Sequence, residues 1–188
     1  MMIKLVENER ELHQILALQK ENHPSSLCEK KMQKKGFITV LHEFEALKKM
    51  NDKAAHIIAI DNDVVVAFAL VMLKEFKNLV PMLIPMFTSF EQIQFQNRKL
   101  NTLNFYVMGQ ICVQDNFKRK GILKKLYLKH KEIYSDTFEY CVTEISSSNT
   151  PSMIAHQKIG FQTIHTFTDN IAEWNVMLWD WEEKQKII

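Results

Sequence analysis

The sequence is poor in three residue types that often shape a chain: it has three cysteines, four glycines and four prolines among 188 residues. Cys28, Cys112 and Cys141 have neither Cys-x-x-Cys nor Cys/His ligand spacing. Their odd number argues against a secreted disulfide framework, so we expect a reducing, cytoplasmic compartment and no metal site. The few glycines and prolines do not gather into a linker, a repeat or a low-complexity tract, which predicts a single domain over residues 1–188.

An excess of one charge and a long apolar run are also missing. Lysine and arginine number 24, aspartate and glutamate 22, and the formal net charge is +2. No bulk affinity for nucleic acid or for an anionic membrane is therefore indicated. The apolar run Leu79–Phe87 is too short to span a bilayer, and the N-terminal residues become charged too early for a signal peptide. We expect a soluble protein without a membrane partner.

The chain does have a large apolar fraction. Hydrophobic residues make up 46% of it, and 12 residues are phenylalanine, which is enough for a sizeable core. Strands are predicted over residues 3–6, 54–60, 64–73, 103–113, 140–146, 161–167 and 171–181, and helices over 8–21, 27–35, 121–134 and 151–159. Residues 74–101 give a weaker signal, for a helix that carries Phe87, Phe90 and Ile93.

Two predicted helices have recognisable end signals. Ser26 is a candidate N-cap for the helix that Gly36 ends. The later helix has Thr150 as a candidate N-cap, Pro151 at its first position and Gly160 as a left-handed C-terminal cap. After residue 103 the elements therefore form a βαβ unit, a capped helix and a strand pair.

One glycine joins a predicted strand to a basic helix, in the stretch ICVQDNFKRKGILKKLY. Free N–H groups and the helix dipole converge at a helix N-terminus, and Gly121 allows the backbone to approach an anion closely. Basic side chains surround it: Lys118, Arg119, Lys120, Lys124 and Lys125. The pattern predicts a phosphate-binding loop, and the alternative is a solvated basic helix face with a turn glycine.

The same stretch, followed by EISSSNTPSMIAHQKIGF, resembles the GNAT family of acetyl-coenzyme A-dependent N-acetyltransferases over residues 103–181. The loop of that family reads Arg or Gln, two residues, Gly, one residue, then Gly or Ala. Here those positions are Lys118, Gly121 and Leu123, so lysine keeps the charge while leucine is bulky where a small residue is usual. The second segment matches through Asn149, seven residues before His156, and through the Gly-Phe ending.

The resemblance implies an α/β fold of the GNAT type: a mixed, mostly antiparallel sheet, splayed at the coenzyme strand, with helices on both faces. It also implies acetyl-CoA as the acyl donor. The residues assigned to donor binding lie on the coenzyme strand, the basic loop and two helix starts: Ile111, Cys112, Val113, Lys118, Arg119, Lys120, Gly121, Ile122, Leu123, Lys124, Asn149 and Ser152. Cys112 could also be read as a covalent nucleophile, and the alternative is a core position. For Asn149 we expect a hydrogen bond to backbone or to the pantetheine arm, and the alternative is a turn asparagine.

Acetyl transfer to an amine requires a neutral nitrogen, and a lysine-like amine of pKa about 10.4 is about 4.6 kcal/mol away from that state at pH 7. A base must therefore accept a proton. By the resemblance Glu144 is the candidate, and burial would have to raise its pKa. The alternative is a surface glutamate in an ion pair.

Transfer also requires a hydrogen-bond donor for the thioester oxygen and a proton for the departing sulfur. A strand amide near Val113 is expected to supply the first. His156 stands where the family usually has a tyrosine acid, so we expect it to supply the second, and the alternative is that it only packs against the coenzyme. The remaining histidines show no metal-ligand spacing.

The sequence therefore predicts an N-acetyltransferase acting on a small-molecule or peptide amine, and it leaves a homodimer open. Phe87, Phe90, Phe95 and Tyr106 either wall the amine pocket or belong to the core. The alternative function is a non-catalytic acyl-CoA-binding regulator, which the atypical Leu123 favours. A nucleic-acid module on the basic helix is disfavoured, because aromatics suited to base stacking are missing there.

Overall fold

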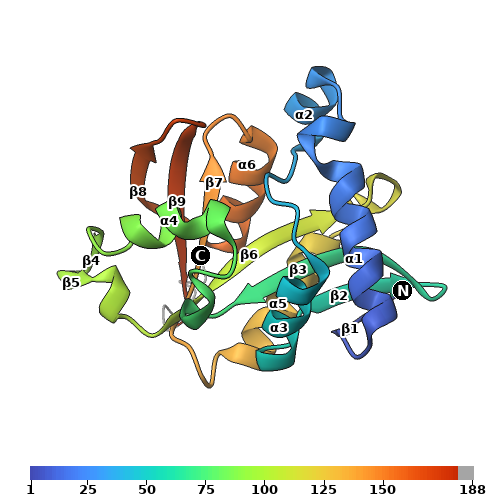
Figure 1. The fold of residues 1–188 in the computed structure, drawn as a ribbon, viewed down its shortest axis with the longest axis horizontal. Helices are drawn as coiled ribbons and strands as arrows, with labels where there is room; N and C mark the ends of the chain where they lie inside the picture. Colours follow the sequence, from blue (N-terminus) through green and yellow to red (C-terminus); the bar gives the residue numbers. More distant parts are fainter. Residues whose placement is uncertain (182–188) are drawn as a thin grey trace, which may run out of the picture.

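The computed structural model describes residues 1–181, which fold around a seven-stranded sheet (Figure 1). The first half contains β1 (Met2–Leu5), α1 (Glu9–Asn22), α2 (Glu29–Lys35), α3 (Phe44–Lys53), β2 (Ile57–Asp61), β3 (Val64–Met72), the 3-10 turn η3 (Pro81–Leu83), α4 (Ile84–Ser89), β4 (Gln94–Phe95) and β5 (Arg98–Lys99). The second half contains β6 (Phe105–Val113), α5 (Ile122–Tyr134), β7 (Tyr140–Ser146), α6 (Thr150–Ile159), β8 (Gln162–Thr168) and β9 (Glu173–Asp180).

The sheet has the strand order β1-β2-β3-β6-β7-β9-β8. All neighbours run antiparallel except β6 and β7, so the predicted mixed, mostly antiparallel sheet is confirmed. The parallel pairing joins Phe105–Val107 to Tyr140–Val142 and goes no further. Beyond it the two strands diverge (Figure 1). The sheet is therefore splayed at one place, between its two parallel strands.

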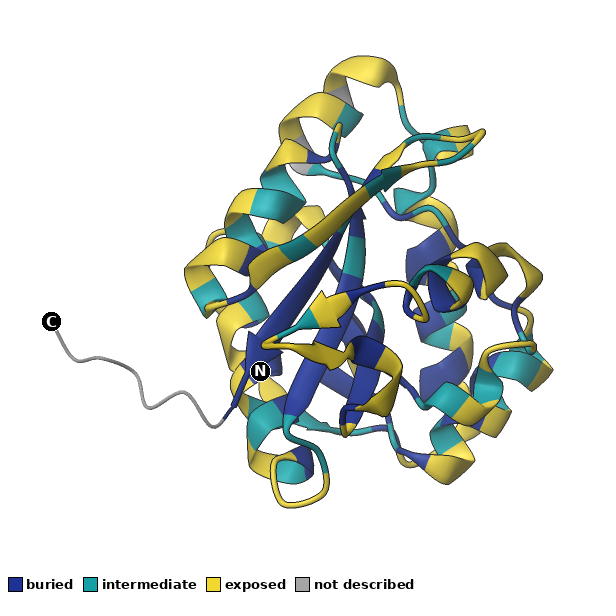
Figure 2. Ribbon diagram, turned by 90° about the vertical axis from the view of Figure 1, so that its left-hand side faces the viewer, coloured by how far each residue is buried: buried dark blue, intermediate teal, exposed yellow. Residues whose placement is uncertain are grey.

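Two hydrophobic clusters cover the two faces of the sheet. One packs α1, α3 and α4 against β3 and β6, with Ile15, Leu47 and Phe90 among its fully buried side chains. The other packs α5 and the end of α6 on the opposite face, around Tyr106 and Tyr127. Figure 2 shows the central strands as the most deeply buried part of the molecule. The predicted placement of helices on both faces is confirmed.

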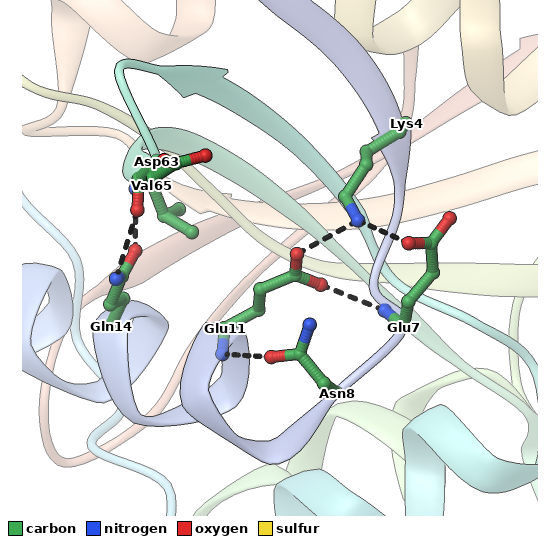
Figure 3. Close-up of polar contacts among 7 residues, drawn as sticks. All are labelled: Lys4, Glu7, Asn8, Glu11, Gln14, Asp63 and Val65. Carbon is green, nitrogen blue, oxygen red and sulfur yellow. Dashed lines mark hydrogen bonds and ion pairs between the residues drawn. The ribbon is translucent and has the colours of Figure 1, made fainter.

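The start of α1 is held by a compact polar cluster (Figure 3). Asn8 accepts a hydrogen bond from the Glu11 N–H at 3.1 Å, which caps the helix. Glu11 accepts a bond from the Glu7 N–H at 2.8 Å and pairs with the Lys4 ammonium at 2.8 Å. These contacts fix the angle at which α1 leaves β1.

One turn further along, Gln14 ties α1 to the β2–β3 hairpin (Figure 3). Its side-chain oxygen accepts from the Val65 N–H at 2.6 Å, and its amide donates to the Asp63 carbonyl at 3.3 Å. Asn62 and Asp63 adopt left-handed backbone angles in that turn, which Asn and Asp tolerate better than most residues. α1 is thereby anchored to the sheet at its N-terminal end.

The first half departs from the sequence prediction in three places. Helix α3 was not predicted, because Glu43 at its N-cap makes no capping bond, although Leu47 and Met50 are buried at helical spacing. The cap at Ser26 is wrong, since Cys28 precedes α2 and makes no side-chain bond. A short β4–β5 hairpin takes part of the segment expected to be helical. Among the described residues, no helix has the length and apolarity needed to cross a membrane.

Candidate active site

A β-bulge marks the point where β6 leaves β7. Ala69 of β3 pairs with Ile111 and Val71 pairs with Met108, so Gly109 and Gln110 together face one residue of β3. Such a bulge takes a residue out of the ladder and redirects its backbone groups. The sequence placed a donor amide near Val113, whereas the bulge puts the irregular backbone at Gly109 and Gln110, at the start of the splay.

The splay holds a narrow slot of about 60 Å³. One wall is β6 and the other is β7, and a Thr143 hydroxyl bond to the Met108 carbonyl, 3.0 Å long, joins them. Residues from β6, β7, α6 and the chain before α3 line it: Phe37, Ile38, Thr39, Met108, Gly109, Gln110, Ile111, Thr143, Glu144, Ile145, Ser146, Asn149, Ser152, His156 and Trp174. Five predicted site residues, Ile111, Glu144, Asn149, Ser152 and His156, thus come together here.

Asn149 closes the slot from one side. Its amide donates to the Phe37 carbonyl at 2.9 Å, and its oxygen accepts from the Ser152 N–H at 3.4 Å. The residue is 6% exposed. It is therefore Asn149 that caps α6, while Thr150 is the first helical residue, and the predicted cap at Thr150 is wrong. Of the roles considered for Asn149, a bond to backbone is the one observed.

The contact between Asn149 and the chain before α3 requires a glycine at position 36. Its φ of +75° lies in the left-handed region, and a Cβ built there would stand 2.9 Å from the Asn149 side-chain oxygen. Any other residue would meet both strain and a clash. The glycine predicted to end α2 therefore also lets the chain before α3 lie directly against the slot.

A second, larger cavity of about 240 Å³ adjoins the slot. Its walls come mainly from η3 and α4 and from the turn between β8 and β9: Pro24, Thr39, Val40, Met82, Leu83, Pro85, Met86, Val107, Met108, Gly109, Glu144, Phe167, Asp169, Ile171 and Trp174. Glu144, Met108, Gly109, Thr39 and Trp174 line both spaces. Glu144 is the ionisable group at their junction.

Burial of Glu144, and secondarily the nearby Asp169 charge, raises its pKa from 4.5 to about 8. The Oε1 atom is buried and has no hydrogen-bond partner among the described residues. No salt bridge joins Glu144 to a described lysine or arginine. The surface ion pair considered as an alternative is therefore not the arrangement observed, and the burial that a base requires is present.

His156 is held on both sides by other groups. Its Nδ1–H donates to the Ser152 carbonyl at 2.8 Å, so Nε2 accepts the bond from the Tyr127 hydroxyl. The ring is 1% exposed and packs edge-on against Tyr127 and Phe161. Burial lowers its pKa to about 4. With a neutral ring and both nitrogens engaged, the geometry favours packing over proton donation.

The glycine loop has the predicted form. Gly121 directly precedes α5 with φ +73°, and a Cβ there would meet nothing within 4 Å. Arg119 also has a left-handed φ, of +63°. Lys118 pairs with Asp115 at 3.0 Å and Lys120 lies over the Phe117 ring at 5.0 Å. The helix N-terminus is therefore open to solvent and surrounded by cations.

Three predicted donor residues turn their side chains to the core. Ile122 is 1% exposed, and Leu123 packs against the same hydrophobic cluster. Leu123 thus fills space under α5, which accounts for its size. Cys112 is 8% exposed, which agrees with the core alternative, and burial raises its thiol pKa to about 12, which disfavours a thiolate nucleophile.

The four aromatic residues considered for the amine pocket do not line either cavity. Phe87, Phe90 and Tyr106 are buried in the core, and Phe95 packs against Tyr140. The core alternative is therefore confirmed for them. Methionine, leucine and proline of η3 and α4 make the wall instead.

A buried polar network beside the slot was missed. Gln19 is 0% exposed; its amide donates to the Gln110 side-chain oxygen at 2.8 Å and lies 3.0 Å from the His42 Nδ1. Gln110 in turn donates to the Val40 carbonyl at 2.8 Å. The network joins α1, the chain before α3 and the bulge. Its sequence signal is a glutamine in an apolar position of α1.

Comparisons with known proteins agree on the fold alone. No protein-family model matches the sequence, and no curated protein sequence matches it. A GNAT-family acetyltransferase from Streptococcus agalactiae has a TM-score of 0.65 at 11% identity, over 97% of this chain and 96% of that chain. The ribosomal-protein-S18-alanine N-acetyltransferase from Escherichia coli has a TM-score of 0.62 at 12% identity, over 100% and 97%.

A chain of the NatC complex, in a crystal structure bound to Gag peptide and CoA, has a TM-score of 0.64 at 12% identity, over 95% of this chain and 97% of that chain. At such identities the likeness concerns architecture. The chain has the fold of the GNAT acetyltransferases.

Proposed function

We propose that this protein is an acetyl-CoA-dependent N-acetyltransferase that transfers the acetyl group directly to an amine. The observation that carries the proposal is the position of Glu144: a partly buried carboxyl, whose buried Oε1 atom has no partner among the described residues, at the junction of a strand-walled slot and an apolar cavity. Two substrates that enter from the two spaces meet beside one proton acceptor. The coenzyme-bound and N-acetyltransferase neighbours of the same fold support this assignment.

The donor side has features that suit two parts of acetyl-CoA, its phosphate groups and its pantetheine arm. Exposed amides at the start of α5, the left-handed Gly121 and the surrounding lysines suit phosphate groups. The free edge of β6 from Met108 to Val113 suits the amide groups of the pantetheine arm. When bound, acetyl-CoA supplies the thioester whose acetyl carbon the amine attacks. The narrow slot and the Asn149–Phe37 bond require the chain at Phe37–Thr39 to move outward on binding.

The acceptor side depends on Glu144. A base is most effective when its pKa lies near the working pH, and the pKa of Glu144 is raised to about 8. An ionised Glu144 takes the proton that the amine must lose, the C–S bond of the thioester breaks as the C–N bond forms, and the coenzyme leaves as a thiolate that takes its proton from water. The bulge amides at Gly109 and Gln110 lie beside it along the shared wall and are our candidates for holding the thioester oxygen. The Nδ1–H of His156 is engaged by the Ser152 carbonyl and its Nε2 by the Tyr127 hydroxyl, so we assign this residue to packing and not to proton donation.

A non-catalytic acyl-CoA-binding regulator is the second candidate. One observation favours it: both ring nitrogens of His156 are engaged, so this residue does not supply the acid that transfer would use. A regulator has no need of a base, however, and would leave the desolvated Glu144 without a function.

The test combines binding with turnover. Acetyl-CoA is expected to raise the melting temperature of the purified protein, and addition of amines is expected to release the coenzyme thiol, followed with a thiol reagent. A melting temperature that rises without thiol release from any amine identifies the regulator. A melting temperature unaffected by acetyl-CoA, together with no thiol release, contradicts the proposed function.

A further inference from the structure

The larger cavity determines what kind of amine can reach Glu144. Its volume of about 240 Å³ exceeds the roughly 150 Å³ of an engineered apolar cavity that holds benzene. There is room for one aromatic ring or one branched aliphatic group. Met86 of α4, Leu83 of η3 and Phe167 of β8 all line the cavity.

The charge of the lining has one sign. Among the described residues around the cavity, the ionisable side chains are the carboxyls of Glu144 and Asp169, and neither lysine nor arginine is present. Asp169 accepts bonds from the N–H groups of Ala172 at 2.9 Å and Ile171 at 2.7 Å, which hold its pKa below the usual value and keep it ionised, whereas Glu144 is largely protonated below its raised pKa. An ammonium group is attracted to the Asp169 charge, and to Glu144 where that group is ionised, whereas a carboxylate or phosphate is repelled.

Beyond these two carboxyls, the polar side-chain groups of the lining are the Thr39 hydroxyl and the buried Trp174 indole N–H. Val40, Leu83, Met86, Val107 and Phe167 contribute carbon surface. A second charge placed against this carbon surface would lose its water without gaining an ion-pair partner, which is costly. At the mouth, Met82 is 54% and Ile171 69% exposed, so the apolar surface continues outward from the cavity.

We propose that the cavity selects a primary amine whose adjoining substituent is apolar and uncharged. The amine lies at Glu144 and Asp169, and the substituent fills the space between Met86 and Phe167. A primary amine next to an apolar group occurs in a free arylalkyl or alkyl amine and also in a peptide whose first residue has a large apolar side chain. The proposal rests on the proposed function, because it names the acceptor of that same site.

A series of amino-acid amides isolates the substituent, since the nucleophile is nearly constant. We expect leucinamide, methioninamide and phenylalaninamide to exceed serinamide and aspartamide in kcat/KM by about tenfold or more. Phenethylamine and a tripeptide amide that begins with leucine distinguish the two sources of the chemistry. Equal kcat/KM values across the series, or a preference for spermidine or an aminoglycoside, would overturn the proposal.

A gain of function provides the sharper test. Phe167→Glu places a carboxylate in the cavity wall and is expected to lower kcat/KM for leucinamide by about tenfold while raising it for lysinamide. Thr166→Glu, on the neighbouring exposed position of the same strand, is the matched control and should preserve the parental preference. A preference that is the same in both variants and the parent would contradict the assignment of the cavity.

Failure of the proposed function has a different signature. If no amine supports transfer, saturation-transfer NMR with leucinamide and serinamide still tests the cavity. A leucinamide signal that Phe167→Glu reduces and Thr166→Glu retains supports the apolar amine site even without catalysis. Equal signals for the two amides in all three proteins overturn it. Transfer to polar amines alone leaves the enzyme assignment intact and removes only the inference about the substituent.

Discussion

The slot and the apolar cavity are neighbours that share Glu144, yet they are built in opposite ways. The slot is walled by strand backbone from β6 and β7 and by a helix cap, so its shape follows from strand pairing and a bulge. The cavity is walled by side chains from η3, α4 and the β8–β9 turn, so its shape follows from which residues occupy those short segments. Backbone geometry suits a constant ligand, whereas side chains and short connections can change with the acceptor.

Glu144→Gln removes the group that both spaces share and should have the largest effect. We expect turnover at pH 7 to fall by about 10²-fold or more, because the amide cannot accept a proton. In the parent, kcat/KM should rise with pH through about 8, where Glu144 ionises, and the variant should recover at high pH as the amine loses its proton unaided. Glu139→Gln, just before the same strand, is the control. A loss that is equal at every pH would assign Glu144 to binding instead.

The raised pKa of Glu144 also has a consequence for stability that does not require activity. The folded protein holds this proton more tightly than the unfolded chain, so the stabilising contribution is complete below pH 4.5 and is lost as pH rises toward about 8. Melting temperatures of parent and Glu144→Gln should therefore diverge between pH 5 and about 8, in favour of the variant. Parallel curves would contradict the burial of this carboxyl.

Gly121→Glu addresses the predicted phosphate-binding loop before α5. The variant combines a strained left-handed residue with a negative charge where phosphate is expected, and the acetyl-CoA-induced rise in melting temperature should disappear. Gly121→Ala carries the strain without the charge, and open space surrounds its Cβ, so it should keep most of the rise. If Gly121→Glu retains the full rise, the phosphates bind elsewhere.

Gly36→Ala tests the closure of the slot, with a smaller expected effect. Its left-handed φ and the 2.9 Å approach to Asn149 should lower the free energy of unfolding by about 1–3 kcal/mol and break the bond to Phe37. Gly109→Ala on the opposite wall is the comparison, because its Cβ would have an ordinary contact of 3.6 Å with Met72. Chemical denaturation measures both. Equal losses of unfolding free energy in the two variants would mean that the close contact between Gly36 and Asn149 contributes no more to stability than the ordinary contact at Gly109.

His156→Phe should have the smallest effect on turnover. If the ring only packs, the rate stays within about threefold of the parent, while the Tyr127 hydroxyl loses its partner and stability falls by about 1–3 kcal/mol. Adding Tyr127→Phe should restore part of that stability, because both polar groups are then gone. A fall of about 10²-fold in rate at unchanged stability would return His156 to the role of acid.

The sequence by itself determined the elements with strong local signals. Periodicity and the backbone preferences of single residues predict three features: the strand and basic loop that lead through Gly121 into α5, the helix that begins at residue 150 and ends before Gly160, and the strands before and after that helix. These signals are local, so they survive without knowledge of the neighbours. The expectation that Glu144 must be buried also needs no fold, because it follows from the raised pKa that a general base requires.

Only the tertiary structure decided what those residues face. Gln19 is buried because His42 and Gln110 approach it from distant segments. The Nδ1–H of His156 donates to the Ser152 carbonyl and its Nε2 accepts from Tyr127, and the larger cavity is lined by residues of η3, α4 and the β8–β9 turn but not by Phe87, Phe90, Phe95 or Tyr106. Hydrogen-bond partners and desolvation depend on contacts across the sheet, and a linear pattern carries no information about which long-range partner satisfies a given polar group.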